Sequence, residues 1–146
     1  MLKLNGEEFT VGRSGFHDHP PGRTSEATSK VYVKVGLQGI GTILAVLDTG
    51  AAWSLLEPEV AFALGLFGGS GQEVSLETRM RTIRGRLERV PLTLLADEGQ
   101  DLEMDATVFV SRDWPGKNFL GYSGLLERIR FALDPTGRDF YFGHRA

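Results

Sequence analysis

The sequence predicts an all-β domain, and three observations support this prediction. Short apolar or alternating segments recur at strand-like intervals of roughly 8–12 residues along most of the chain. The 146 residues include 19 glycines, about twice the usual frequency of roughly 7%, which indicates many tight turns. Hydrophobic residues make up 41% of the chain, enough for one core, and the length fits a single domain of about 100–150 residues.

The individual elements follow from these patterns. Val31, Val33 and Val35 alternate with Tyr32 and Lys34, as in a half-buried strand. Further strands are expected at residues 43–47, 53–56, 104–110, 129–134 and 140–142, and short helices at 57–65 and near 123–127. Because residues 43–47 are apolar throughout, we expect that strand to be buried on both faces.

Two segments need separate treatment. Residues 73–95 place strand-forming residues on both sides of a polar stretch at 81–86, which predicts a long hairpin with an exposed tip there. Residues 1–29 lack apolar periodicity and contain Pro20 and Pro21. We therefore expect residues 1–29 to form an N-terminal arm or linker, with a short strand at 8–11, and residues 30–146 to form the folded domain.

Composition excludes several classes of site. The chain has no cysteine, which excludes disulfides, thiolate nucleophiles and cysteine-based metal sites. Its net charge of −3 gives no reason to expect nucleic acid as a partner. The N-terminus lacks the apolar core of a signal peptide, and no stretch approaches the ~18 apolar residues of a membrane span, so we expect a cytoplasmic protein with no membrane partner.

The segment Leu47-Asp48-Thr49-Gly50-Ala51 is the most informative one for function. An acidic residue at the end of an apolar strand is costly to bury as a charge, so it requires a specific role. The threonine offers a hydroxyl, and the glycine lets backbone approach closely, which suits a turn that holds a carboxylate.

This segment resembles the signature of the retropepsin-like aspartic proteases, the single-domain relatives of pepsin. In that family an apolar strand leads into Asp-Thr/Ser-Gly-Ala, and a second signature of two apolar residues and a glycine, followed by a short helix, comes roughly 60–80 residues later. Here Phe119-Leu120-Gly121 precedes the helix expected near 123–127, and Gly121 follows Asp48 by 73 residues. The predicted hairpin lies where the family has its flap, and the resemblance covers roughly residues 30–143.

The resemblance implies an acid-protease fold, a closed barrel with one or two short helices. It implies an aspartic endopeptidase that binds an extended peptide or protein substrate and uses no cofactor or metal. Since the chain has one Asp-Thr-Gly, it implies a homodimer in which each subunit contributes Asp48. Thr49 and Gly50 then complete the catalytic loop. Ala51 and Ala52, with the hairpin residues Thr82, Ile83, Arg84 and Gly85, are the expected substrate-binding residues.

The same residues also have other interpretations. Asp48 is also compatible with a turn aspartate that caps its own backbone. The same fold without proteolysis would be a peptide-binding or interaction module, and an unrelated small β-barrel is a third alternative. Trp53 fits either the core or the wall of a pocket. His17 and His19 are compatible with metal ligation, but a polar loop is the simpler interpretation.

The predicted hairpin is rich in arginine. Arg79, Arg81, Arg84, Arg86 and Arg89 lie on it with only two glutamates nearby. A solvated edge that discourages aggregation explains this pattern, and a preference for acidic residues in the substrate is the sharper alternative. Binding of nucleic acid is a weaker one, since no aromatic residues are interleaved with the arginines.

Overall fold

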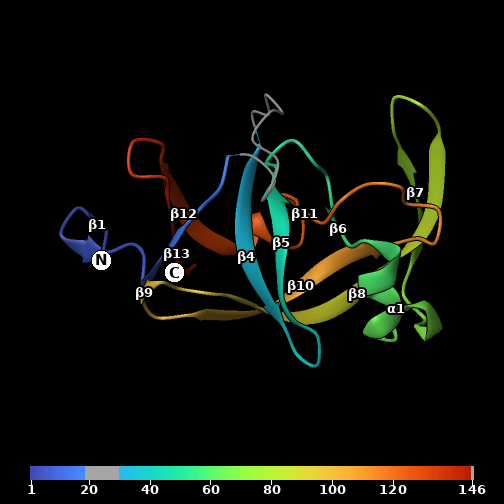
Figure 1. Ribbon diagram of the computed structural model, residues 1–146, viewed down its shortest axis with the longest axis horizontal. Helices are drawn as coiled ribbons and strands as arrows, with labels where there is room; N and C mark the ends of the chain where they lie inside the picture. Colours follow the sequence, from blue (N-terminus) through green and yellow to red (C-terminus); the bar gives the residue numbers. More distant parts are fainter. Residues whose placement is uncertain (19–29, 146) are drawn as a thin grey trace.

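Strands make up most of the computed structural model, which describes residues 1–18 and 30–145 (Figure 1). The strands are β1 (Lys3–Leu4), β2 (Glu7–Glu8), β3 (Gly12–Gly15), β4 (Val31–Leu37), β5 (Gly41–Leu47), β6 (Ser54–Leu55), β7 (Glu73–Glu77), β8 (Thr82–Leu94), β9 (Glu98–Gly99), β10 (Leu102–Val110), β11 (Phe119–Leu120), β12 (Ile129–Asp134) and β13 (Asp139–His144). The helical segments are α1 (Pro58–Ala63) and the 3-10 helices η1 (Leu66–Gly68) and η2 (Leu126–Arg128). The fold is all-β, as the sequence predicts.

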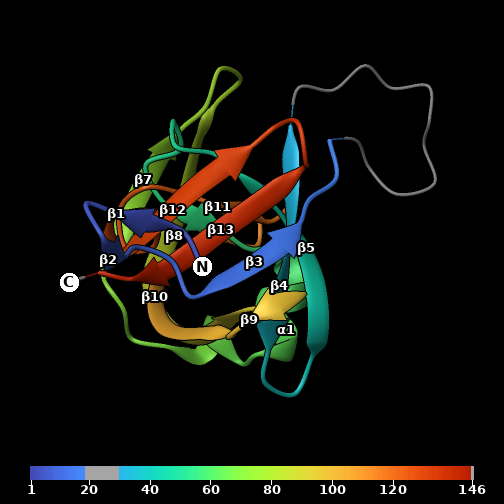
Figure 2. The ribbon, with the colours of Figure 1, turned by 90° about the vertical axis from the view of Figure 1, so that its left-hand side faces the viewer.

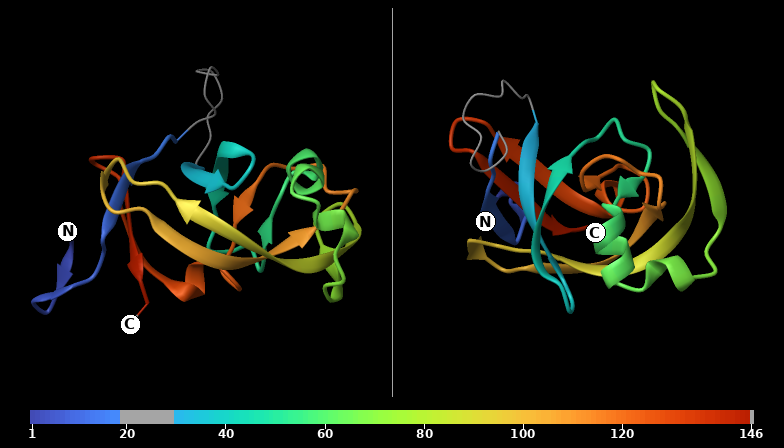
Figure 3. Two further views of the ribbon diagram at one scale, coloured as in Figure 1. Left: turned by 90° about the horizontal axis from the view of Figure 1, so that it is seen from below. Right: turned by 45° about the vertical axis from the view of Figure 1, so that its right-hand side comes forward.

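The main sheet contains seven strands in the order β10-β6-β11-β5-β4-β8-β7. Strands β8 and β10 also pair with each other, antiparallel, from Leu94 opposite Leu102 to Arg86 opposite Val110. This second pairing joins the two ends of the order and closes six of the strands into a ring, with β7 outside it as a partner of β8. Figure 3 shows from below how the long β8–β10 pair extends along the molecule.

A second sheet has the order β12-β13-β3-β9, and Figure 2 shows β12, β13 and β3 side by side. Strand β3 comes from the region that the sequence assigns to an arm or linker. The structure differs there: instead of one strand at 8–11, β2 ends at Glu8 and β3 spans Gly12–Gly15, paired with both β13 and β9. Residues 19–29 of the expected arm lie outside the described residues.

Ion pairs fasten β3 to its neighbours. Arg13 pairs with Glu98, with 2.8 Å between Nη2 and Oε2, and also with Asp139 of β13. Hydrogen bonds to Glu98 and then Asp139 raise the pKa of Arg13, so it stays protonated. Lys34 of β4 pairs with Asp97, and the N–H of Gly15 donates to the same carboxylate at 2.7 Å. These two contacts, with that of Lys34 the larger, lower the pKa of Asp97. The charges thus join the N-terminal strand to both sheets.

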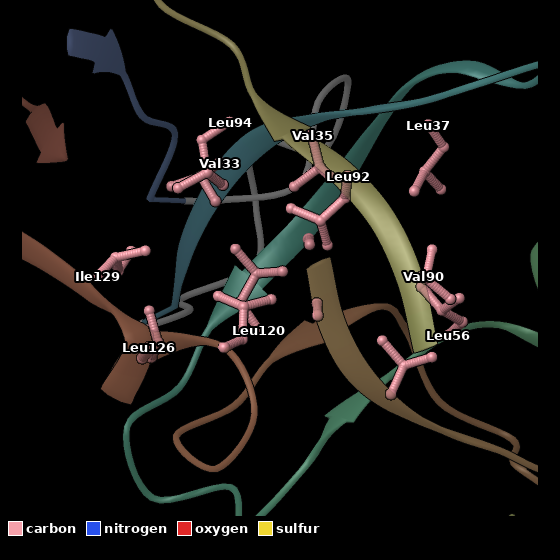
Figure 4. Close-up of a cluster of buried hydrophobic side chains, with 14 of the residues drawn as sticks. Val33, Val35, Leu37, Leu56, Val90, Leu92, Leu94, Leu120, Leu126 and Ile129 are labelled. Atoms are coloured by element: carbon pink, nitrogen blue, oxygen red, sulfur yellow. The ribbon is translucent and has the colours of Figure 1, made fainter. Parts of the chain in front are cut away.

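The main hydrophobic core fills the inside of the ring. Figure 4 shows Val33 and Val35 of β4, Leu92 and Leu94 of β8 and Leu120 of β11 gathered around one space. Each of these side chains is at most 4% exposed, and burial of such a side chain contributes about 1.5–3 kcal/mol. Because Leu120 belongs to this cluster, the core fixes the position of β11, which matters for the site described below.

Strand β5 is less buried than its composition predicts. Ala45 and Val46 are buried, but Ile43, Leu44 and Leu47 are only half-buried in this chain. Because side chains alternate along a strand, Ala45 and Val46 lie on opposite faces, and so do the half-buried Ile43 and Leu44. The expectation of burial on both faces therefore holds at the centre of the strand and not over its whole length.

The helix expected at 57–65 is confirmed as α1. Pro58 lies at its start, where a missing N–H costs nothing, and Gly65 follows it with a φ of +72°, the left-handed conformation that glycine adopts readily. The helix turns the chain away from β6 toward η1 and the β7–β8 hairpin. Among the described residues, no helix is long and apolar enough to cross a membrane.

Candidate active site

Asp48 is the first residue after β5, at the start of the loop that leads to β6. Its side chain is half-buried, and its Oδ1 accepts the N–H of Gly50 at 2.9 Å. The N–H of Ala51 donates to the carbonyl of Asp48 at 3.2 Å and closes a tight turn around Thr49 and Gly50. This turn orients the carboxylate. A purely structural turn aspartate forms the same bond, so the bond alone does not distinguish the two interpretations.

The loop is fixed by β11, which lies between β5 and β6. Leu120 runs parallel to β5, opposite Leu47, and its carbonyl accepts the N–H of Asp48 at 3.0 Å. Phe119 pairs with Leu55 of β6 in the antiparallel sense. The chain before Asp48 and the chain after it therefore lie on either side of a strand from a distant part of the sequence. We call residues 46–55 and 118–123 together the crossing.

Backbone hydrogen bonds continue the crossing beyond β11. The N–H of Tyr122 donates to the carbonyl of Ala51 at 2.9 Å, and that of Ser123 to the carbonyl of Ala52 at 3.0 Å. Trp53 forms an isolated parallel bridge with Ser123. Ala51 and Ala52, two of the predicted substrate-binding residues, are thus held beside the Asp48 turn by their carbonyls. The sequence motif does bring its two halves together in space.

Two buried polar side chains support the crossing from inside. Ser54 is 1% exposed, and its Oγ accepts the N–H of Gly121 at 2.9 Å. Asn118 is 5% exposed; its Oδ1 accepts the N–H of Glu57 at 2.8 Å, and its Nδ2 donates to the carbonyl of Leu44 at 3.2 Å. Buried polar groups need such partners, so the backbone groups that these two side chains bond explain why they are buried here. Sequence reasoning missed them, although both lie directly beside the motif residues.

Gly121 occupies a place that no other residue fits. A Cβ added there would lie 2.3 Å from the carbonyl oxygen of Trp53 and 2.8 Å from the nitrogen of Ser54. Both are backbone atoms, which a side-chain rotation cannot move away. The glycine of the apolar-apolar-Gly signature is therefore required by the close approach of the two chain segments.

The outer rim of the crossing is open to solvent. Thr49, Gly50 and Ala52 are exposed, and Tyr122 is 51% exposed. In the described part of the chain, the hydroxyl of Thr49 makes no hydrogen bond. Tyr122 was not among the predicted residues, and no pattern around it marks it as part of the site. The rim offers a carboxylate, a hydroxyl and an aromatic ring on one surface.

The β7–β8 hairpin rises on the same side of the molecule as the loop after β5, as Figures 1 and 3 both show. Its turn is formed by residues 78–81, and not by 81–86 as the sequence predicts. Thr78 makes this turn: its N–H donates to the carbonyl of Arg81 at 2.9 Å, and its hydroxyl donates to the same oxygen at 2.8 Å. The exposed tip therefore carries Arg79 and Met80, which is 91% exposed.

The predicted hairpin residues lie on β8, with alternate residues on opposite faces. Ile83 is 3% exposed, and a Cβ on Gly85 would meet the carbonyl of Val110 at 2.3 Å, so this pair faces the rest of the domain. Thr82 and Arg84 are exposed and belong to the opposite face, which we call the outer face. Their contact with substrate remains a prediction.

A small apolar cluster joins the hairpin to the crossing. Leu55 of β6, Ile83 of β8 and Phe109 of β10 form its buried centre, and Trp53 and Leu76 pack against it from the crossing and the hairpin. Trp53 is half-buried in this cluster, which favours its interpretation as core. The position of the hairpin is therefore coupled to the loop that carries Asp48.

The histidines singled out in the sequence are not gathered into a metal site in the part of the chain that the structure describes. His17 forms a bridge with Tyr32, and His19 lies outside the described residues. Within residues 1–18 and 30–145, no group of three or more histidine, aspartate or glutamate side chains is placed to hold a metal ion.

Comparison with known proteins gives a similarity at the level of the fold. No family model matches the sequence, and no curated protein matches it. Among solved structures, the chain is similar to a crystal structure of a retropepsin-like aspartic protease from Rickettsia conorii, with a TM-score of 0.60 and 19% sequence identity. The similarity covers 90% of this chain and 98% of that chain. The chain has a retropepsin-like fold.

At this identity the similarity establishes the fold and not the activity. In a retropepsin-like fold, the expected elements are all present here: the apolar β5, the Asp-Thr-Gly-Ala turn, the hairpin and the apolar-apolar-Gly segment on β11. The order of the motifs predicts that these elements lie together, and the backbone hydrogen bonds of the crossing join the Asp48 turn to β11.

Proposed function

We propose that the chain is an aspartic endopeptidase that works as a homodimer with Asp48 of each subunit at the two-fold axis. The observation that carries this proposal is the crossing. Ser54 and Gly121 hold its two segments together, Asn118 bonds the chain on either side of the Asp48 loop, and that loop presents a half-buried carboxylate next to the exposed Thr49 and Gly50. A turn aspartate that only capped its own backbone would not need this support.

The homodimer follows from the chemistry. Two carboxylates a few ångströms apart cannot both ionise cheaply, so they share one proton. The ionised carboxylate takes a proton from a bound water, and the protonated one donates to the carbonyl of the scissile peptide bond. The attack forms a tetrahedral intermediate without a covalent bond to the protein. One chain supplies one Asp-Thr-Gly, so the second carboxylate comes from a second copy.

Each neighbouring residue has a role in this proposal. The free hydroxyl of Thr49 reaches across the two-fold axis to brace the partner's loop, and Gly50 admits the substrate backbone. Ala51 and Ala52 expose backbone groups to the extended peptide. The β7–β8 hairpin acts as the flap, with residues 78–81 at its tip and Thr82, Ile83, Arg84 and Gly85 on β8 directly after the tip.

Asp48→Asn tests the proposal directly. Asparagine keeps an Oδ1 that accepts the N–H of Gly50, so we expect the fold and the dimer to persist. It has no carboxylate to act as base or acid, so we expect cleavage to fall at least about a hundred-fold. Cleavage of a mixed peptide library from about pH 4 to 7, which spans ionisation of a carboxylate pair, is compared for the two proteins at several concentrations.

The concentration series separates the possible outcomes. Cleavage that requires Asp48 and rises faster than linearly with protein concentration supports a dimeric enzyme. Equal cleavage by wild type and Asp48→Asn contradicts the assigned role of Asp48. A chain that is dimeric by sizing and cuts nothing in the library favours the alternative, a peptide-binding module with the same fold.

A further inference from the structure

The outer face of the β7–β8 hairpin borders two open concavities, away from the face that packs on the domain. The smaller has a volume of about 220 Å³ and lies between β8, η1 and the loop after β10. The larger, of about 440 Å³, lies along the paired strands β7 and β8. Both are lined by Arg84 and Arg86, and Arg112 lines the smaller one. We call these three residues the arginine cluster.

The arginine cluster is held in place by its surroundings. The guanidinium of Arg112 lies over the ring of Phe67, 4.3 Å from its centroid. Arg86 donates from Nη1 to the carbonyl of Gly69. The backbone of Arg84 is fixed by the buried Ser111, whose Oγ donates to the Arg84 carbonyl at 2.7 Å. Side chains that are positioned in advance lose less entropy when a ligand binds.

Two of these guanidinium groups have N–H donors that are available to a ligand. In the described part of the chain, the side chains of Arg84 and Arg112 form no hydrogen bond or ion pair, and both residues are exposed. The acidic residues among the lining are Asp113 in the smaller concavity and Glu73 in the larger. Three positive charges thus converge locally on a chain whose net charge is −3.

We propose that the arginine cluster binds an acidic peptide segment, a short run of aspartate or glutamate in a partner protein. Guanidinium groups bind carboxylates through paired, charge-assisted hydrogen bonds. Arg84 and Arg86 are two residues apart on one strand face, about 7 Å, so successive acidic side chains of a peptide reach both. The smaller concavity accommodates side chains but not a folded element.

Nucleic acid fits this surface less well. The aromatic ring that lines the smaller concavity, Phe67, already has the guanidinium of Arg112 over its face, so it is less available to stack on a base. If the proposed protease activity holds, the arginine cluster binds acidic residues of the substrate through Arg86 and Arg112 as well as through Arg84 of the flap. Binding itself does not depend on Asp48.

Binding of fluorescein-labelled hexaglutamate, followed by fluorescence anisotropy, tests the proposal. The full chain carries Asp48→Asn throughout, so that cleavage cannot affect the signal. The test variant is Arg84→Gln/Arg112→Gln, and the control is Arg89→Gln/Arg145→Gln, which removes two exposed arginines outside the concavities and changes the net charge equally. We expect the test variant to bind about tenfold more weakly or worse, and the control within about twofold of the parent.

Several outcomes overturn the proposal. One is no binding by the parent at about 10 mM salt, where surface charges are little screened. Another is an equal loss in both double variants, which would indicate a general charge effect. Tighter binding of a single-stranded hexanucleotide through the same two arginines would assign the surface to nucleic acid. If the double variant unfolds, the single variants Arg84→Gln and Arg112→Gln are measured, each with an expected loss of about threefold.

Discussion

The crossing and the β7–β8 hairpin are parts of one sheet, yet they are held in different ways. The crossing is bonded on both sides: β11 pairs with β5 and β6, buried Ser54 bonds the backbone of Gly121, and buried Asn118 bonds the chain at Leu44 and Glu57, just beyond it. Above Arg86 the hairpin pairs only with itself, because β10 ends opposite that residue. The fold therefore fixes the carboxylate loop rigidly and leaves the hairpin as a projecting two-stranded arm.

This difference suits the proposed reaction. A catalytic carboxylate must keep one geometry, and buried hydrogen bonds from several strands provide it. A cover for an extended substrate must admit and release the chain, and an arm with few contacts allows that. The hairpin is restrained by the buried Ile83, which packs against Leu55 and Phe109, and by Arg81, whose Nη2 donates to the carbonyl of Asp113 at 2.8 Å.

Gly121→Ala is the change with the largest expected effect on the crossing. The new Cβ would overlap the backbone of Trp53 and Ser54, which forces the two chain segments apart. We expect a loss of about 3 kcal/mol in the free energy of unfolding, measured by denaturant titration, and a matching loss of cleavage.

Gly68→Ala is the matched control for that change. Gly68 has a negative φ, and a Cβ there meets nothing within 4 Å, so its effect should stay within about 0.5 kcal/mol. If Gly121→Ala were as stable as Gly68→Ala, the crossing would not depend on close backbone approach, and its rigidity would need another explanation.

Two buried serines allow the crossing and the hairpin to be perturbed one at a time. Ser54→Ala leaves the N–H of Gly121 without its partner, and Ser111→Ala leaves the carbonyl of Arg84 and the N–H of Asp113 without theirs. Both serines are at most 4% exposed, so each substitution should cost about 1–3 kcal/mol of stability. The proposed function predicts that kinetics distinguish them: Ser54→Ala lowers kcat, while Ser111→Ala chiefly raises KM.

Steady-state kinetics with one cleaved peptide, alongside thermal unfolding of both variants, supply the measurement. Equal changes in kcat and KM for the two serines would mean that the crossing and the hairpin act as one unit. The crossing and the hairpin would then still differ in how they are held, but they would not differ in what they contribute to catalysis.

The crossing was predictable from sequence because its chemistry depends on a few residue types in a fixed order. The carboxylate of Asp48 accepts the N–H of Gly50 within a tight turn, and Gly121 is required by a close backbone contact, so the motif carries the geometry. The supporting Ser54 and Asn118 were missed because a serine and an asparagine are common everywhere and acquire meaning only from what they contact.

The hairpin tip was misplaced for a physical reason. The polar stretch at 81–86 suggested a turn, but Gly85 is there because β8 passes close to the carbonyl of Val110. The actual turn at 78–81 contains no glycine, proline or asparagine and is made by the side chain of Thr78. The N-terminal strand, expected at 8–11, was misplaced likewise: Gly12–Gly15 has low strand propensity, and its pairing with β13 and the ion pairs of Arg13 make it a strand.

Thr78→Ala perturbs the turn of the hairpin and has the smallest expected effect on the free energy of unfolding. The hydroxyl of Thr78 accepts the N–H groups of Met80 and Arg81, at 3.3 and 3.2 Å, and all three residues lie near or at the surface. Water replaces these bonds when the hydroxyl is removed, so the free energy of unfolding should fall by at most about 0.5 kcal/mol. Amide hydrogen exchange should nevertheless become faster at residues 78–82 and stay unchanged at 118–123, because the projecting arm opens without the crossing.

Thr82→Ala is the control. Thr82 is an exposed threonine on β8, just outside the turn, and its substitution should leave hydrogen exchange in both regions unchanged. Faster exchange at 118–123 in the Thr78 variant would show that opening of the hairpin spreads to the carboxylate loop through the cluster of Leu55, Ile83 and Phe109, and the two regions would then have to be treated as a single dynamic unit.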